Sequence, residues 1–505
     1  MKNDANEQRA QYAKFLYRAT FGPKKGEIDN LQKIGIETWF EQQTAAPPSY
    51  HLPKAQEFAA LSDESVNDNM RTGAWWQRTI QADDQLRQRM AYTLSQIFVV
   101  SKHGVGNRHA ELANYYDILV KHAFGNFRDL LEEITLSSVM GKYLTLEGSQ
   151  KTNTDKNTFP DENFAREIMQ LFSLGLWELQ PNGWPKLDAQ GNKIPTYSQN
   201  DVEELARAFT GWRSNDLFAP MYADNGRHDN EAKEILGTSF PAGQSAEQDM
   251  QQALDLLFNH DNTPAFIATL LIKRFVTSNP RRQYILRVAD VFRSNADGIR
   301  GDLQAVLTAV LTDSDVLNGF AESGDLQRKN TFGRVHEPII AVANLARAFA
   351  MESSGPRWWD YQYTEAHLGQ SPLTSPSVFN FYTPDFTPQG ELAENNLTSP
   401  EFYILTADNM RRIHNRLWAN IYAAWAQPNE KSWIWDAAEF EALQAFPEQY
   451  IALINERLFG GLISQGLAEY LNYMLTVELQ GAYAHLRVRN TLYVAVTSPE
   501  FFSPE

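Results

Sequence analysis

The stretch TFPDENFAREIMQLFSLG, residues 158–175, predicts an amphipathic helix around which the rest of the chain is organised. Its apolar residues form a broad face, while Asn163, Arg166, Glu167 and Gln170 follow the spacing i, i+3, i+4 and i+7. Side chains at these positions share one face of a regular α-helix, because a turn takes about 3.6 residues. We therefore expect two amides, a guanidinium and a carboxylate on the side opposite the apolar face.

The two ends of this helix are also predicted by the sequence. Thr158 with Asp161 three residues later fits a capping pattern, and Pro160 suits a first helical turn. Gly175 is expected just after the last turn, since glycine readily adopts the left-handed conformation that ends helices. The polar face itself has two interpretations. It is either the wall of an active site or a surface that faces water, and charged stripes usually face water.

The pattern Asn-Phe-Ala-Arg-Glu-x-Met-x-Leu-Phe-x-Leu-Gly in this stretch is similar to the hallmark of a large bacterial family called domain of unknown function 1800. Other segments that resemble that family are Phe15–Gly22, Leu86–Ser101, Asn114–Leu131, Tyr197–Trp212, Phe258–Val276, Ile299–Leu311, Leu368–Tyr382, Ser399–Phe402 and Ser498–Phe501. The resemblance covers nearly the whole chain. It implies kinship with this family, and it does not imply a particular activity.

The resemblance also implies a location and a partner. Proteins of this family commonly look exported, and their genes often look paired with the family called domain of unknown function 1501, which resembles sulfatases and phosphatases. That pairing favours chemistry on a surface polymer. The N-terminus of this sequence lacks an apolar signal core. We expect a periplasmic or extracellular protein whose signal segment is absent from this sequence, with a cytoplasmic protein as the alternative.

Composition describes a globular protein and excludes several classes of function. Of the 505 residues, 43% are hydrophobic and 12% aromatic, which is typical of a chain with a packed core. The net charge of −17 argues against nucleic acid as a partner, because such proteins normally carry a basic surface. No run of about 18 apolar residues occurs, so we expect no transmembrane segment.

The chain contains no cysteine, which excludes disulfides, thiolate metal ligands and a cysteine nucleophile. Without thiolates and without closely spaced ligands, we expect no structural zinc and assign no metal ligands. The sequence indicates no particular cofactor. It also lacks the Walker A and Rossmann motifs of nucleotide-binding proteins and the His-Glu-x-x-His and Gly-x-Ser-x-Gly motifs of hydrolases.

Helical periodicity over most of the chain predicts a mainly α fold. The exception is a segment at about residues 177–240, which is rich in proline, glycine, asparagine and tryptophan, with turns at Asn182-Gly183 and Gly191-Asn192 that are typical of hairpins. Inside this segment we expect a helix from about Ser198 to Trp212, with Ser198 and Asp201 as its capping box. No linker divides the pattern. We therefore predict one large helical domain over residues 1–505, with a small β-hairpin insertion at about 177–240.

Four side chains are candidates for acid–base catalysis, namely Asp117, His122, Glu167 and His228. A carboxylate close to a histidine is the minimum requirement for moving a proton in a reaction. The alternative is structural, because buried ion pairs between such residues more often hold a fold together than catalyse. We expect Glu167 to be buried with at least one arginine or histidine from another segment, and to line a cleft with the other three side chains. Candidate substrate-binding residues are Asn163, Arg166, Gln170, Arg207 and Trp212.

The tryptophans point to a class of ligand. Several of the 12 tryptophans lie in turn-rich segments rather than in helical stripes, among them Trp177 and Trp184. Indole faces next to carboxylates and amides bind sugars by stacking and polar contacts, although the same side chains also serve as packing.

Three functions therefore stay open. The first is an extracytoplasmic enzyme that acts on a glycan or another surface polymer by carboxylate and histidine chemistry. The second is a non-catalytic binding or assembly component of the envelope that works with the sulfatase-like or phosphatase-like partner. The third is a metal-dependent oxidoreductase with His122, Glu167 and His228 as ligands.

Overall fold

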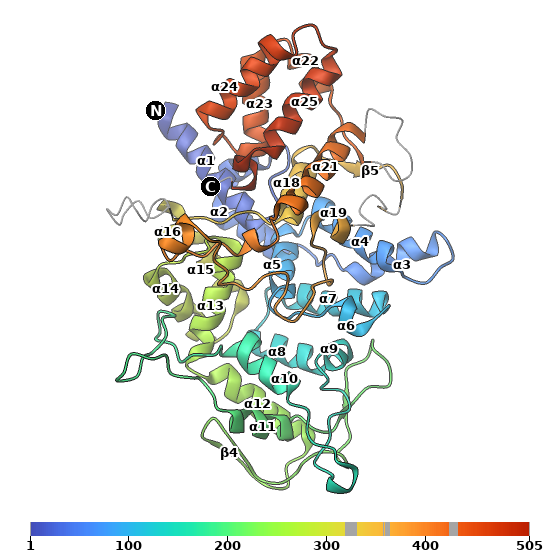
Figure 1. The fold of residues 1–505 in the computed structure, drawn as a ribbon, viewed down its shortest axis with the longest axis vertical. Helices are drawn as coiled ribbons and strands as arrows, with labels where there is room; N and C mark the ends of the chain where they lie inside the picture. The colour runs from blue at the N-terminus through green and yellow to red at the C-terminus, as the bar shows by residue number, and fades with distance from the viewer. Residues whose placement is uncertain (1, 319–330, 357, 359–363, 424–432, 504–505) are drawn as a thin grey trace.

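The computed structural model describes residues 2–318, 331–356, 358, 364–423 and 433–503, and it confirms the mainly α fold. Helices make up 58% of the structure, with only small two-stranded antiparallel sheets in the described part. The molecule is elongated (Figure 1). Helices from the C-terminal part of the chain form one end, and the segment around α11, α12 and the small strands forms the other.

The first third of the chain supplies helices to the middle of the molecule and to one side of it. α3 packs on α4 and α7, and α5 packs on α7. These elements are α1 (Lys2–Ala19), α2 (Glu27–Ala45), α3 (His51–Ala60), α4 (Asp68–Gln81), α5 (Gln85–Ser95), α6 (Lys102–Val105), α7 (His109–His122), α8 (Phe127–Leu136) and α9 (Ser138–Tyr143).

The middle third holds the family hallmark and a second group of packed helices, in which α13 contacts both α14 and α15. A short 3₁₀ turn, Thr154–Lys156, precedes this group. Its elements are α10 (Asn163–Glu167), a π-helical turn (Ile168–Ser173), α11 (Gln199–Ala208), α12 (Ala246–Asn259), α13 (Asn262–Phe275), α14 (Arg282–Arg293), α15 (Leu303–Thr312) and α16 (Ser314–Asn318).

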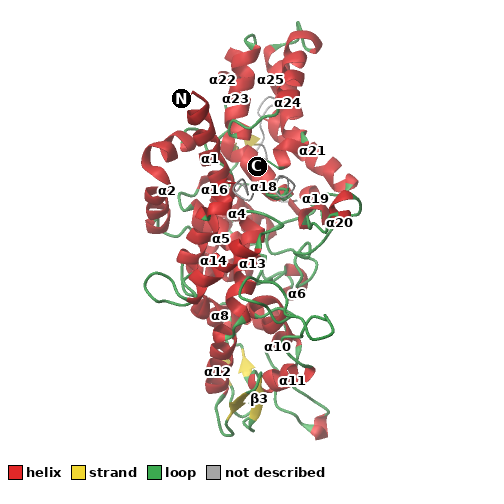
Figure 2. Cartoon of the chain, turned by 90° about the vertical axis from the view of Figure 1, so that its left-hand side faces the viewer, coloured by secondary structure: helices red, strands yellow, loops and turns green. Residues whose placement is uncertain are grey.

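The last third begins inside the body and ends in the helical tip that Figure 2 shows at the top. α18 packs on α4 and α23, which ties this part to the N-terminal third. The elements are α18 (Pro338–Ala348), α19 (Thr364–Leu368), α20 (Glu391–Glu394), a 3₁₀ turn (Pro400–Tyr403), α21 (Ala407–Ala423), α22 (Ala438–Leu443), α23 (Pro447–Phe459), α24 (Gln465–Tyr473), a π-helical turn (Met474–Glu478), α25 (Ala484–Thr497) and a 3₁₀ turn (Pro499–Phe502).

The predicted hairpin insertion is present. Isolated antiparallel bridges flank both predicted turns, and β1 (Trp212–Arg213) pairs with β2 (Tyr222–Ala223), while β3 (Lys233–Ile235) pairs with β4 (Thr238–Phe240). One further sheet lies outside the predicted region, where β5 (Glu352–Ser353) pairs with β6 (Trp433–Ile434). Its two strands are far apart in the chain, so no local turn pattern could have indicated the pairing.

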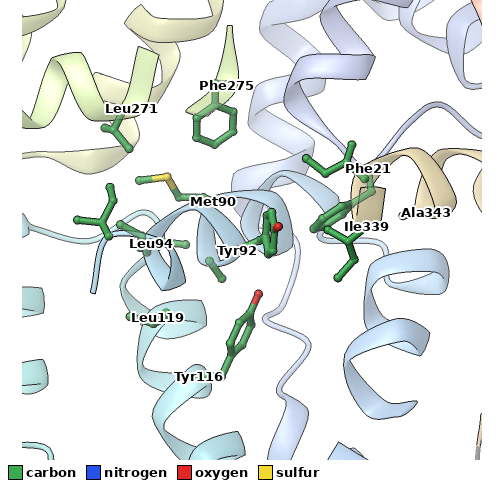
Figure 3. Close-up of a cluster of buried hydrophobic side chains, with 14 of the residues drawn as sticks. Phe21, Met90, Tyr92, Leu94, Tyr116, Leu119, Leu271, Phe275, Ile339 and Ala343 are labelled. Atoms are coloured by element: carbon green, nitrogen blue, oxygen red, sulfur yellow. The ribbon is translucent and has the colours of Figure 1, made fainter. Parts of the chain in front are cut away.

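Helix α5 lies at the centre of the core and is buried on every side. In Figure 3 its residues Met90 and Leu94 lie among side chains from α13 and α18, including Leu271, Phe275 and Ile339. A helix that is buried all round has no water-facing side for its polar residues. The arginines and glutamines of α5 must therefore find partners inside the protein, because an unpaired buried charge is costly.

Tyr92 and Gln96, at the C-terminal end of α5, enter a buried ion network. Glu337 accepts hydrogen bonds from the Tyr92 hydroxyl at 2.6 Å and from the Gln96 amide at 2.7 Å. The Arg334 guanidinium bridges Glu337 and Glu401, each at 2.9 Å. Burial alone would raise the pKa of Glu337, but Arg334 and further donors lower it to about 2. Glu337 is therefore ionised throughout the physiological pH range, and the network holds segments from three parts of the chain together.

Candidate functional site

The helix of the family hallmark begins later than the capping pattern predicted. α10 starts at Asn163, whose N–H donates to the Asp161 carboxylate at 2.9 Å, while the N-cap residue Glu162 makes no capping bond. Thr158 instead pairs with Asn153 in an antiparallel bridge, with backbone N–H···O distances of 2.9 and 3.1 Å. Thr158 is extended in this bridge and lies four residues before the N-cap position, Glu162, so it is too early to cap the helix. The predicted N-terminus at Thr158, with Pro160 in the first turn, is therefore wrong.

The helix also changes its type after Glu167. Residues Ile168–Ser173 form a π-helical turn in which the Leu174 N–H donates to the Met169 carbonyl at 2.9 Å. A π-helix has more residues per turn than an α-helix, so Gln170 does not keep the angular position that a regular helix would give it. The end at Gly175 is confirmed by its φ of 79°, and a Cβ atom there would lie 2.9 Å from the Phe266 ring.

Glu167 is buried, with 7% of its surface exposed. Its neighbour Arg166 turns away to Glu162 at 2.9 Å and to Gln199 at 3.2 Å. Among the described residues, the Glu167 Oε2 atom has no hydrogen-bond partner. Burial raises the pKa of Glu167, and the Arg166 charge opposes the rise only in part. Burial therefore makes Glu167 easier to protonate than an exposed glutamate.

Two phenols lie near this carboxyl group. Burial raises the pKa of Tyr143 to about 12, and the negative charge of Glu167 adds to the rise. Burial likewise raises the pKa of Tyr197, and there too Glu167 contributes. Of the other side chains on this short helix, Asn163 is exposed and Gln170 is partly buried. The expected arginine or histidine partner from another segment is not found for Glu167 within the described part of the chain.

Asp117 caps the N-terminus of helix α3. Its carboxylate oxygens accept hydrogen bonds from the backbone N–H groups of His51 at 2.6 Å and Leu52 at 3.0 Å, the first two residues of α3. These groups have no partner within their own helix, so Asp117 stabilises its beginning. Burial raises the pKa of Asp117 to about 7, and the two backbone hydrogen bonds oppose the rise.

His122 pairs with a carboxylate that the sequence did not single out. Its Nε2 atom and the Lys121 ammonium both contact the Glu133 carboxylate, the ammonium at 2.6 Å. The His122 hydrogen bond is the main reason why the pKa of Glu133 falls to about 2. Asp117, Lys121 and Glu133 line a pocket of about 310 Å³. Asp117 and the partner of His122 thus share one pocket.

His228 lies in a separate and fully buried cluster. Its Nε2 atom contacts Asp249 at 3.1 Å, and the Lys233 ammonium reaches the same carboxylate at 2.7 Å. Burial alone would raise the pKa of Asp249, but the bonds from His228, Lys233 and Gln244 outweigh burial and lower it. This arrangement is a buried ion pair that fastens the hairpin insertion to α12.

The remaining predicted binding residues also lie in this insertion. The Arg207 guanidinium forms two hydrogen bonds with Asp229, at 2.9 and 3.1 Å, and further bonds with Glu204. Trp212 is buried in β1, and its indole N–H has no partner among the residues that the structure describes. Both side chains therefore face the interior of the insertion rather than the pocket beside Asp117.

Of the four predicted catalytic residues, Asp117 and the partner of His122 thus line the same pocket, whereas Glu167 and His228 do not line it. In the described ranges, no three histidine, aspartate or glutamate side chains gather closely enough to hold a metal ion. The set His122, Glu167 and His228 is accordingly not assembled as a metal centre.

A groove of about 1240 Å³ opens on another side of the molecule. Three segments form most of its described walls: the hairpin turn at residues 183–185, the α13–α14 connection with adjoining parts of both helices, and the loop around α20 (residues 391–398). Thr331 also lines the groove. The Asn279 side chain joins two of these walls, because it donates to the Thr398 carbonyl and accepts from the Thr398 N–H, both at 2.9 Å. The Lys273 ammonium donates to the Pro384 carbonyl at 3.0 Å.

Both ends of the loop that carries α20 enter the buried ion network. At one end the Tyr382 ring lies under the Arg274 guanidinium, 4.9 Å from the ring centre. At the other end Glu401 binds Arg334. An irregular segment that is anchored at both ends loses less conformational entropy on ligand binding than a free segment does. This wall of the groove is therefore preorganised.

Trp184 lies in the groove with 40% of its surface exposed. The Arg282 guanidinium stacks on one face of this indole, 4.2 Å from the ring centre. The same insertion offers an internal comparison. Trp177 is 38% exposed and lies under the Lys193 ammonium at 5.6 Å, but it does not line the groove.

The family model described as "Protein of unknown function (DUF1800)" matches residues 14–503, nearly the whole chain. The chain belongs to this family. No curated protein and no solved structure matches it. In the described parts of this DUF1800 protein, no helix is both long enough and apolar enough to cross a membrane.

The buried ion network was not predicted from the sequence. Most of its residues lie in the segments by which the chain resembles the DUF1800 family. These segments contribute Arg89, Tyr92 and Gln96 from residues 86–101, Arg274 from 258–276, Gln370 and Tyr382 from 368–382, and Glu401 from 399–402. A signal for it existed: polar residues interrupt an otherwise apolar pattern at residues 86–98. It could not show which residues become partners.

Proposed function

We propose that this protein binds a glycan or another polymer in the groove between the hairpin turn, the α13–α14 connection and the α20 loop. One observation carries the proposal, namely an exposed indole, Trp184, set among amide, hydroxyl and charged side chains of a single groove. An indole offers an apolar face to the C–H groups of a sugar ring, while the polar groups around it bind hydroxyls.

The size of the groove favours a polymer over a small metabolite. Its volume of about 1240 Å³ exceeds the range of roughly 300–1,000 Å³ that is usual for pockets of small ligands. A groove formed by three separate segments can accommodate several consecutive units of a chain.

Binding is favoured over hydrolysis at this groove. Glycosidases generally need a pair of carboxyl groups that flank the scissile bond. Among the described residues that line the groove, Glu391 is the one carboxylate. The sequence-predicted candidates Asp117, His122, Glu167 and His228 lie elsewhere, so this groove lacks the arrangement for the two-carboxylate reaction.

A cell-envelope setting fits this function. The family resemblance supports an extracytoplasmic location and a partner from the domain of unknown function 1501 family. In this proposal the protein presents a surface polymer to the sulfatase-like or phosphatase-like partner. Fractionation of the native cells with an antibody, and co-purification of the two proteins, test this part.

Affinity electrophoresis tests the binding function. The purified protein is run through gels that contain dextran, xylan, pectin, alginate or chondroitin sulfate, and we expect at least one polysaccharide to retard it. Trp184→Ala removes the stacking face and should abolish the retardation. The matched control is Trp177→Ala, which removes a similarly exposed indole outside the groove and should migrate like the wild type. Equal losses in the two variants, or no retardation by any polysaccharide, would refute the proposal.

Glu167 offers a second candidate function, acid catalysis. Its buried carboxyl group has an oxygen without a partner in the described structure, and the phenols of Tyr143 and Tyr197 lie near it. A protonated carboxyl group can donate a proton to a leaving group. The test is the release of new chain ends from whichever polysaccharide the groove retains. We expect Glu167→Gln to abolish release without changing retention, and Glu162→Gln to leave both unchanged. Cleavage that survives Glu167→Gln would exclude this role.

A further inference from the structure

We propose that the polymer is acidic, and that Lys273 and Arg282 bind its carboxylate or sulfate groups. This inference rests on the proposed binding function and names the ligand class. It follows from the charges that line the groove, which contrast with those of the whole molecule.

The first cation is Lys273, near the C-terminal end of α13. Its ammonium contacts only a backbone carbonyl oxygen, that of Pro384, among the partners that the structure shows for it. Burial lowers the pKa of Lys273, because removal from water disfavours the charged form. An ammonium group held in this way has donor capacity left over, since it carries three N–H groups. The Asp385 and Glu401 carboxylates favour the charged form of Lys273, but neither forms an ion pair with it in the described structure. An anionic group in the groove could contact the ammonium directly.

The second cation is Arg282, the first residue of α14. No carboxylate in the described part of the chain forms an ion pair with it, and stacking on Trp184 holds it in place. Stacking occupies the flat face of a guanidinium and leaves its N–H groups in the ring plane available for a planar or tetrahedral anion. Neighbouring Arg281 differs, because it is paired with Asp315.

These cations are conspicuous in an acidic protein. The chain carries a net charge of −17, which would repel an acidic polymer from most of its surface. Among the described lining residues, Lys273 and Arg282 are cations outside any ion pair and Glu391 is the one carboxylate, so the groove is a local exception. A neutral glycan would need neither cation, and hydroxyl groups would compensate a partly buried ammonium less well than an anion does.

Polymers that share a sugar backbone but differ in charge distinguish the effect of charge on binding from the effect of sugar structure. The full chain is run in gels that contain dextran, carboxymethyl-dextran or dextran sulfate of equal length, and pectin in fully methyl-esterified or de-esterified form. We expect retardation by the acidic forms and little by the neutral ones. The comparison of carboxymethyl-dextran with dextran sulfate shows which anion is preferred. Raising the salt concentration should weaken binding, since mobile ions screen the charges.

The variants Lys273→Gln and Arg282→Gln test the two cations, and each should weaken binding of the acidic polymers about tenfold or more. Lys193→Gln is the matched control, because it removes a lysine stacked on the other exposed tryptophan and should have no effect. Thermal unfolding confirms that each variant is folded.

The outcomes distinguish the two proposals. Equal retardation by neutral and acidic forms, lost in Trp184→Ala, would overturn the acidic ligand and leave the binding function in place. Retardation by acidic forms that survives both cation variants would place the binding outside the groove and overturn both proposals, as would no retardation by any of these polymers.

Discussion

At the scale of single residues, the carboxyl group of Glu167 is the clearest case of a side chain whose surroundings set its behaviour. It is buried, no arginine among the described residues forms an ion pair with it, and burial raises its pKa. The folded protein therefore binds a proton at this position more readily than the unfolded chain does. Ionisation of Glu167 at higher pH therefore lowers the free energy of unfolding.

Glu167→Gln should leave the free energy of unfolding at pH 7 within about 0.5 kcal/mol of the wild type, or raise it, because no partner charge is stranded. Any gain in the free energy of unfolding is fully present at pH values above the raised pKa of Glu167 in the folded wild type. The gain should fade as the pH falls toward the ordinary glutamate pKa of 4.5. Urea unfolding at several pH values measures it. A loss of about 3 kcal/mol would instead reveal a buried ion pair.

The buried pair of Asp249 with Lys233 predicts the opposite behaviour. Asp249→Asn leaves the Lys233 ammonium without its counter-charge in the interior and should cost about 3 kcal/mol of stability. The control is Glu162→Gln at the exposed pair with Arg166, which should cost less than about 1 kcal/mol. In the wild type, the lowered pKa of Asp249 stabilises the fold above the ordinary value of 3.8, and this stabilisation is lost as the pH falls through the folded-state value.

At the scale of elements, the two helices that the sequence predicted to be capped behave differently. α11 has the predicted capping box, in which Ser198 and Asp201 exchange hydrogen bonds with each other's backbone. α10 has no such cap, and Thr158 lies in an extended bridge before it. The same sequence pattern therefore produced a cap only where the flanking backbone was free to enter a helix.

This difference is testable with one pair of substitutions. Ser198→Ala should cost about 1 kcal/mol, the usual loss when a helix cap is removed. Thr158→Ala should change stability by less than about 0.5 kcal/mol, because its hydroxyl has no hydrogen-bond partner among the described residues. Chemical denaturation of both variants under one condition gives the comparison. A larger loss for Thr158→Ala than for Ser198→Ala would contradict the assignment of α10.

At the scale of the whole molecule, one hydrophobic cluster contains residues from Ala13 to Phe502, and the ion network joins α5, α13, α18 and the turn at Pro400–Tyr403. Contacts of this kind favour unfolding in one step. The prediction of a single domain over residues 1–505 leads to an experiment of its own.

Limited proteolysis should nick the chain first within residues 147–157, 213–245 or 355–400, and it should not release two stable halves. Residues 151–157 are all exposed, which fits the first of these sites. Within the third range, residues 357 and 359–363 lie outside those that the structure describes. Mass spectrometry of the fragments over time identifies the sites. Two folded fragments of comparable size that separate on gel filtration would show two domains.

Local spacing was sufficient to predict most of the secondary structure. The helical class, the two hairpin turns, the end at Gly175 and the capping box at Ser198 were all predicted correctly, because each depends on residues within a few positions of one another. The π-helical turn after Glu167 escaped prediction, since the 3.6-residue period assumes a regular helix. Of the candidate site, burial of Glu167 was predicted correctly, whereas its expected partner from another segment was not found.

Only tertiary packing decided which polar side chains meet. Glu401 lies 67 residues from Arg334, and Arg89 lies 185 residues from the Arg274 carbonyl to which it donates. Asp117 was expected to line a cleft with Glu167 and His228, but it caps α3. The groove beside Trp184 is formed by segments that are far apart in the chain. A helical period shows which face of an element is polar. The partner of that face depends on how the helices pack across the core, and side-chain spacing along one helix carries no information about it.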